Sequence, residues 1–297
     1  MPAAHGLNTK EQVRLGAHMS IAGGVDRAFD RALEVGCQTM QIFTKSSNQW
    51  RARPLGEREV ERFLRLKEES GVWPVVAHDS YLINLASPDP ELWRKSVEAL
   101  ATELERCATL GLRHLIIHPG AHMGAGEEAG LQHIAAALNE ALERTSEQPV
   151  EVVLEITAGQ GTGLGHRLEH LAYLMEQSVD ERRLGVCFDT CHALAAGYDI
   201  RTREGYEAAF RAFDRVLGLE RLRAFHLNDS KREVGSRVDR HEHIGKGVLG
   251  LEPLRMLLND ARFRHLPMIL ETPKGPDMRE DLENLATLRS LVYTDSL

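Results

Sequence analysis

Short apolar runs that end in a polar or ionisable residue recur eight times along the chain. Continuous apolar runs of this length are typical of strands that are buried on both faces of a parallel sheet. The runs are Leu15–His18, Met40–Thr44, Val75–His78, Leu115–His118, Val152–Glu155, Gly185–Asp189, Ala224–His226 and Met268–Glu271. Most are spaced widely enough for a loop and a helix to fit between one strand and the next.

The segments between the runs have helical periodicity. Asp89 fits an N-cap with Pro90 at the first helical position. Further helices are expected at 127–144, 167–177, 203–217 and 277–291. Strand and helix repeated eight times predict an α/β fold, the (β/α)₈ TIM barrel. We expect one catalytic domain over residues 14–297, preceded by an N-terminal tail, residues 1–13.

Composition narrows the class of protein. The chain has 42% hydrophobic and 27% charged residues, which excludes a disordered protein. Its runs are too short to span a membrane, and its four cysteines fit no disulfide framework, so we expect a soluble, cytoplasmic monomer that binds no membrane. The net charge of −8 argues, taken alone, against a nucleic-acid partner.

The residues that end the runs carry the chemistry. In TIM barrels the active site lies at the carboxyl ends of the strands, so these residues should converge on one mouth. Six of them are metal-ligand types, namely His78, His118, Glu155, Asp189, His226 and Glu271. Imidazole and carboxylate suit Zn²⁺ or Mn²⁺, and six ligands overfill one tetrahedral zinc ion. The pattern therefore predicts more than one metal.

Two further pairs extend the ligand set. His192 follows Asp189 just beyond the sixth run, and Asp239 and His241 have the i, i+2 spacing that places side chains on one face of an extended segment. Nine candidates are about what three metals need. Cys187 and Cys191 are competing ligands, and Cys191 fits a packed thiol better.

Other features receive weaker interpretations. His18 should lie near the mouth as a partner of a ligand, whereas His122, His243, His166 and His170 are expected to bind no metal, and the last two to be solvated. The glycine-rich stretch 159–165 matches no nucleotide-binding motif. The loop at 44–56 carries basic, amide and aromatic side chains and no acid, which suits a phosphate-bearing substrate.

Longer stretches around these residues resemble the endonuclease IV family of zinc-dependent apurinic/apyrimidinic endonucleases. The matching segments are Gly16–Gly24, Phe43–Lys45, His78–Ala86, His118–Gly120, Leu154–Gly161, Gly185–His192, His226–Lys231, Arg237–His241 and Leu270–Thr272. The resemblance implies a xylose-isomerase-like TIM barrel that holds three Zn²⁺ ions, with Mn²⁺ as a possible substitute. It also implies hydrolysis of double-stranded DNA 5′ to abasic sites, leaving a 3′-hydroxyl and a 5′-deoxyribose phosphate.

The resemblance assigns roles residue by residue. The first zinc would be held by His78, His118 and Glu155; the second by Glu155, Asp189, His226 and Glu271; the third by His192, Asp239 and His241. Glu155 and Glu271 would be catalytic. DNA would be contacted by Asn48, Gln49 and Trp50 in one loop and by Tyr81 and Leu82 in another. Asn48 stands where well-known members carry a basic residue.

Two other functions fit part of the pattern. A sugar isomerase or epimerase uses the same barrel and ligand types, but its sites usually hold one or two metals, so nine ligands favour the nuclease. A non-enzymatic DNA-damage binder would bind the lesion without cutting the strand. Metal stoichiometry and a cleavage assay separate these three functions.

Overall fold

Eight parallel strands form a closed barrel in the computed structural model, which describes residues 13–293. Residues 1–12 of the predicted tail lie outside the described residues. The strands are β1 (Arg14–Met19), β2 (Thr39–Phe43), β3 (Val75–His78), β4 (His114–Ile117), β5 (Glu151–Glu155), β6 (Leu184–Asp189), β7 (Leu222–His226) and β10 (Pro267–Leu270). Each coincides with a predicted apolar run to within two residues. The predicted barrel is confirmed.

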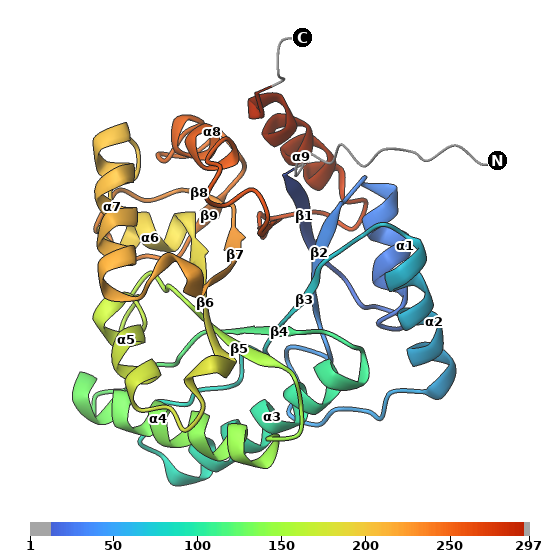
Figure 1. Ribbon diagram of the computed structural model, residues 1–297, viewed down its shortest axis with the longest axis vertical. Coiled ribbons are helices and arrows are strands. Elements are labelled where there is room, and N and C mark those ends of the chain that lie inside the picture. The colour runs from blue at the N-terminus through green and yellow to red at the C-terminus, as the bar shows by residue number, and fades with distance from the viewer. Residues whose placement is uncertain (1–12, 294–297) are drawn as a thin grey trace, which may run out of the picture.

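Helices surround the barrel, as Figure 1 shows. They are α1 (Arg27–Glu34), α2 (Glu57–Glu69), α3 (Pro90–Thr109), α4 (Glu127–Arg144), α5 (Leu168–Glu176), α7 (Arg203–Val216), α8 (Glu252–Leu258) and α9 (Arg279–Leu291). The Asp89 carboxylate accepts hydrogen bonds from the N–H groups of Glu91 (2.8 Å) and Leu92 (3.2 Å), so it caps α3 as predicted. No helix within residues 13–293 has the length and hydrophobicity to cross a lipid bilayer.

The strands alternate between two apolar environments. Residues that face outward pack against the helices in one large core. Residues that face inward form a small separate cluster, which consists of Val76, Ile116, Val153, Cys187, Ala224 and Ile269. Because successive side chains in a strand point to opposite faces, the residue two positions further along also faces inward. That position is occupied in each case by one of the six strand-end ligand candidates.

Two small elements over the barrel mouth are absent from the sequence-based prediction. Helix α6 (Thr190–Ala196) begins directly after β6, and the Asp189 carboxylate caps it by accepting from the His192 N–H at 2.7 Å. A hairpin follows β7, in which β8 (Asp229–Ser230) pairs antiparallel with β9 (His241–Glu242). Asp239 lies in the loop of this hairpin rather than in an extended strand. Both elements bring polar side chains over the mouth.

Candidate metal centre

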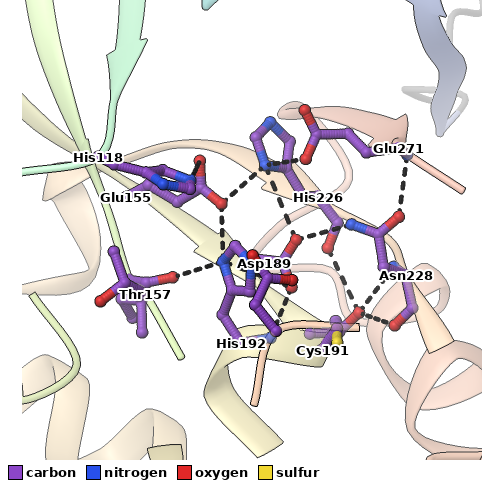
Figure 2. A network of polar contacts seen from close by, with 12 residues as sticks. His118, Glu155, Thr157, Asp189, Cys191, His192, His226, Asn228 and Glu271 are labelled. Carbon is purple, nitrogen blue, oxygen red and sulfur yellow. Dashed lines mark hydrogen bonds and ion pairs between the residues drawn. The ribbon is translucent and has the colours of Figure 1, made fainter. Parts of the chain in front are cut away.

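The six strand-end residues meet around Glu155, which is fully buried. One carboxylate oxygen, Oε2, lies 3.3 Å from His78 Nε2 and 3.5 Å from His118 Nε2. The other oxygen, Oε1, lies 3.2 Å from His226 Nδ1. Figure 2 shows Glu155 between His118 on one side and His226 on the other. The two oxygens of one carboxylate therefore face two different groups of candidate ligands.

Glu271 and Asp189 complete the second of these groups. The Nδ1 atom of His226 lies 3.1 Å from Glu271 Oε2 and 3.8 Å from Asp189 Oδ2. Together with Glu155 they offer four ligand atoms that lie within 4.8 Å of one another. Residues from β5, β6 and β7 and the residue after β10 thus meet at one point, because parallel strands of a barrel end at the same face.

A third group lies above the mouth, where α6 approaches the β8–β9 hairpin. His192 Nε2 lies 3.2 Å from Asp239 Oδ2, and His241 Nε2 lies 3.3 Å from Asp239 Oδ1. His192 Nδ1 also lies 2.9 Å from Glu155 Oε1, which joins this group to the first two. The Asp239 side chain is 39% exposed, so this part of the centre is open to solvent.

The donor set fits divalent cations. Imidazole nitrogens and carboxylate oxygens crowd together here, and they are the ligands that zinc and manganese accept. Among the buried atoms of the candidate ligands, Glu155 Oε1 and His226 Nδ1 have no hydrogen-bond partner within the described residues. Buried polar atoms are nearly always satisfied in folded proteins, and a bound cation would satisfy both of these.

Electrostatics keep the carboxylates of the centre ionised. Burial alone would raise the pKa of Glu155, but the histidines around it, His226 first, lower that pKa well below its ordinary value. Burial also opposes ionisation of Glu271, but His226, His18 and His78 together lower its pKa. Burial opposes protonation of His192, yet Asp189 and Asp239 raise its pKa well above the usual value. The ionised carboxylates would attract a cation, and a cation that binds here would take the place of the proton on His192.

Residues outside the predicted set hold the ligands in place. The Gln41 side chain donates to Glu271 Oε1 at 2.5 Å, and its Oε1 lies 2.8 Å from His226 Nε2. Asn228 donates to Asp189 Oδ2 at 2.7 Å and accepts from the backbone N–H of Glu271 at 2.9 Å. Such partners orient metal ligands and tune their basicity. Gln41 could have been found, since it is a polar residue inside an apolar run.

Comparison with known proteins agrees with this geometry. The family described as "Xylose isomerase-like TIM barrel" matches residues 29–289. A relative from Chloroflexus aurantiacus, "Probable endonuclease 4", is 56% identical over 94% of this chain and 98% of its own. A relative of the same name from Geobacter sulfurreducens is 53% identical over 94% of each chain. The solved structure of endonuclease IV from Thermus thermophilus matches with a TM-score of 0.83 and 42% identity, covering 94% of this chain and 98% of that one.

The chain belongs to the endonuclease IV family. It is a DNA-repair endonuclease, as its named relatives indicate. The structure of a "D-tagatose 3-epimerase-like protein" also aligns, with a TM-score of 0.68 over 94% of this chain, but at 19% identity it shows the shared barrel alone.

Most histidines that were expected to bind no metal lie apart from the three groups. His122 accepts from the N–H groups of Gly124 and Gly126 within its own loop. His243 contacts the Asn284 side chain at 3.1 Å. His18 lies near the mouth as predicted, 2.9 Å from Gln41 Nε2. Cys191 lies within 4.8 Å of ligand atoms of Asp189 and His241, but burial raises the pKa of its thiol to about 12, which favours a packed thiol over a metal-bound thiolate.

The expectation that His166 and His170 are solvated is wrong, because both are buried beside Glu127. The three side chains have the right types for a metal site, but one nitrogen of each imidazole ring already accepts a hydrogen bond. His170 Nδ1 accepts from the Gly165 N–H at 3.2 Å, and His166 Nε2 accepts from the Arg237 guanidinium at 2.9 Å. The lone pair of each neutral ring is therefore used, which favours a structural role, and the remaining His170 nitrogen, Nε2, lies 3.7 Å from Glu127 Oε2 with no hydrogen-bond partner among the described residues.

The residues assigned to DNA contact lie on two loops beside the centre. We call residues 44–56, between β2 and α2, the Trp50 loop, and residues 79–89, between β3 and α3, the Tyr81 loop. Asn48, Gln49, Trp50 and Tyr81 are exposed, and Leu82 is half-buried. Exposed aromatic side chains at the mouth of a cavity are typical of binding surfaces.

A cavity of about 310 Å³ joins the Tyr81 loop to the candidate metal centre. Tyr81 and Asn84 line the cavity together with three candidate ligands, His118, His192 and Asp239. The glycine-rich stretch 159–165 supplies part of the wall. A nucleotide that enters this cavity would lie against the exposed edge of the centre.

Proposed function

We propose that this endonuclease hydrolyses the phosphodiester on the 5′ side of abasic sites in double-stranded DNA, using three Zn²⁺ ions. The first ion would be held by His78, His118 and Glu155; the second by Glu155, Asp189, His226 and Glu271; the third by His192, Asp239 and His241. The products would be a 3′-hydroxyl and a 5′-deoxyribose phosphate. Mn²⁺ could replace zinc, because the same ligand types bind both ions.

One observation carries this proposal: the two oxygens of Glu155 face two separate ligand groups, and a third group adjoins them. A carboxylate in this position can bridge two cations. A mononuclear site would need neither the bridge nor Asp239 and His241. The arrangement therefore favours a trinuclear centre over a site with one or two metals.

The chemistry requires little from the protein beyond these ligands. Zinc, when bound, would activate a water molecule at neutral pH and neutralise charge on the phosphate. Glu155 and Glu271 would hold the ions around the reacting phosphate, and Gln41 and Asn228 would fix the orientation of the ligands. His118 and Asp239 are the most exposed members, at 37% and 39% of their side chains, so the phosphate would approach from their side.

The two loops would select the damaged nucleotide. An abasic nucleotide has no base to unstack, so it leaves the helix at little energetic cost. Trp50, Gln49 and Asn48 from one side, and Tyr81 and Leu82 from the other, would fill the space that opens. Asn48 carries no charge, so this loop would rely on shape and amide hydrogen bonds there.

Incision of a duplex with one abasic analogue tests the proposal. The metal-loaded protein should cut on the 5′ side of the analogue and leave an intact, undamaged duplex uncut. A chelator should abolish cutting, added zinc should restore it, and metal analysis should find three ions per chain. A fully loaded protein that leaves the duplex intact, or that holds one ion per chain, would contradict the proposal.

Glu155→Gln tests the bridge. The variant should lose more than about 100-fold in activity. Mutation of a residue that only hydrogen-bonds to a metal ligand already reduces activity by up to about 100-fold, and Glu155 would be a ligand itself. Glu151→Gln is the matched control, because Glu151 lies at the opposite end of the same strand and pairs with Arg223 at 2.6 Å. The control should retain normal activity and metal content. Near-normal activity of Glu155→Gln would refute the bridging role.

A further inference from the structure

We propose that Glu103 is a positioning residue that fixes the separation of the Trp50 loop and the Tyr81 loop, and thereby sets the affinity for damaged DNA. This inference rests on the proposed function, because that function assigns the two loops to the lesion. Glu103 lies in α3, on the outside of the barrel, and its side chain is completely buried. Burial of a carboxylate is energetically costly, and Glu103 is not one of the candidate metal ligands, so its burial needs an explanation.

The carboxylate of Glu103 contacts both loops. Its Oε1 atom accepts a hydrogen bond from the backbone N–H of Ser80 at 3.0 Å, directly before Tyr81. Its Oε2 atom accepts from the hydroxyl of Thr44 at 3.1 Å, the first residue of the Trp50 loop. Hydrogen bonds to an ionised group are about twice as strong as neutral ones. One side chain thus connects the two loops through both of its oxygens.

Lys45 extends this connection to the tip of the Trp50 loop. Its ammonium lies 3.6 Å from Glu103 Oε1 and donates to the backbone carbonyl of Gln49 at 2.8 Å. Lys45 is only 4% exposed, and a buried ammonium is strongly unfavourable without a counter-charge. Glu103 therefore keeps Lys45 inside the loop, and Lys45 holds the backbone beside Trp50.

Other contacts anchor the base of the Trp50 loop independently. Arg106, one turn further along α3, donates to the carbonyls of Thr44 and Arg53. Loss of Glu103 should therefore release the tip of the loop and not its ends. A single direct hydrogen bond would then connect the loops, from the Ser80 hydroxyl to the Ser47 carbonyl at 2.6 Å.

The connection bypasses the candidate metal ligands. Within residues 13–293, the hydrogen bonds and ion pairs of Glu103 go to Thr44, Lys45 and Ser80 and to none of the nine candidates. A change at Glu103 should therefore alter DNA binding while leaving the metal content and the chemical step intact. This separation of effects distinguishes a positioning role from a general loss of structure.

Glu103→Gln is the decisive variant. Glutamine keeps one oxygen for the Ser80 N–H but removes the charge that faces Lys45. Binding is measured by fluorescence anisotropy on an abasic duplex whose scissile phosphate is replaced by a methylphosphonate, so that the DNA is not cut. We expect binding to weaken about tenfold, with kcat on the cleavable duplex within about twofold of wild type and an unchanged metal content. An unchanged Kd, or a lower kcat with lost metal, would overturn the proposal.

Asp260→Asn is the matched control. Asp260 also pairs with a cation and a hydroxyl, Arg262 at 2.5 Å and Tyr206 at 2.9 Å, but these residues surround a separate cavity formed by α7 and α8. The control should bind DNA as wild type does. If Glu103→Gln fails to fold, Lys45→Met removes the other charge of the pair and should weaken binding equally. Normal binding by a folded Lys45→Met variant would also refute the connection.

The pH dependence of binding gives a second readout. Burial, and then the nearby Asp79, raise the pKa of Glu103 to about 7, against the opposing effect of Lys45. Arg106 is the other charge on α3 near this pair. Wild-type binding should weaken as the pH falls through 7, because a protonated Glu103 no longer balances Lys45. Glu103→Gln should lack this component of the profile, and identical profiles would count against the proposal.

The outcomes separate this inference from the proposed function. If the wild type fails to incise the abasic duplex, the proposed function fails, whereas the binding measurement requires no cleavage and still decides the role of Glu103. If the wild type cuts normally and Glu103→Gln binds normally, the proposed function stands and only the inference is overturned.

Discussion

Protonation of His170 should destabilise this protein in mild acid. The side chain is buried, and its Nδ1 accepts the Gly165 N–H, so the proton of the neutral ring is on Nε2. Burial, and then the neighbouring His166, lower the pKa of His170 to about 4. The folded state therefore favours the neutral ring. This contribution to stability is complete above the unfolded-state pKa of about 6.5 and is lost as the pH falls toward 4.

The size of the effect follows from these two pKa values. Between pH 7 and pH 5 the wild type should lose about 2 kcal/mol of unfolding free energy through His170. His170→Asn removes the titration but keeps an oxygen in position to accept the Gly165 N–H. The smaller side chain should cost about 1 to 2 kcal/mol at pH 7. The wild type should thus be more stable at pH 7, and the gap should close or reverse at pH 5.

Urea unfolding of both proteins at pH 7, 6 and 5 measures this gap. Metal-linked titrations affect both chains equally and cancel in the difference between them. His265→Asn, which changes an exposed histidine, is the control and should follow the wild-type curve. A difference between wild type and His170→Asn that stays constant from pH 7 to pH 5 would refute the reasoning.

Three further predictions concern the centre and the loops. Gln41→Ala should lower metal affinity about 10- to 100-fold by releasing Glu271 and His226, which a chelator competition would measure; unchanged affinity would contradict it. Removal of metal should lower the melting temperature, because a ligand that binds only the folded state stabilises that state. Calorimetry with and without zinc measures this, and identical melting temperatures would contradict it. Tyr81→Ala should weaken binding to abasic DNA about tenfold with normal metal content, because an exposed aromatic contact is lost; anisotropy would detect wild-type binding if Tyr81 plays no part.

The barrel and six of the nine candidate ligands could be predicted because the same local pattern, a short apolar run that ends in a ligand-type residue, indicates both the strand and the ligand. Strand side chains alternate with a period of two, so an inward apolar residue such as Ile116 or Val153 places His118 or Glu155 on the same inner face. The sequence states this directly, as an apolar run that ends in a ligand type. No long-range information is needed, since the barrel itself brings the strand ends together.

The rest of the site depends on contacts that a sequence does not state. His192, Asp239 and His241 meet because α6 and the β8–β9 hairpin fold over the mouth, and both elements are too short to have a periodic signature. His166 and His170 follow a polar, glycine-rich stretch, and only the packing of that stretch against neighbouring loops buries them. Glu103 and Lys45 could be recognised as a pair only after α3 and the Trp50 loop were placed side by side.

Closure of the barrel has a consequence for the timing of activity. The first strand, β1, pairs with the last, β10, and Glu271 directly follows β10. During synthesis, the segments that carry His78, His118 and Glu155 emerge before the last strand. Glu271 joins them only after β10 has emerged and paired with β1. With Glu271 as a ligand of the proposed centre, an unfinished polypeptide could not assemble that centre. Closure of the barrel would therefore have to come before metal loading of the complete centre and before any cutting.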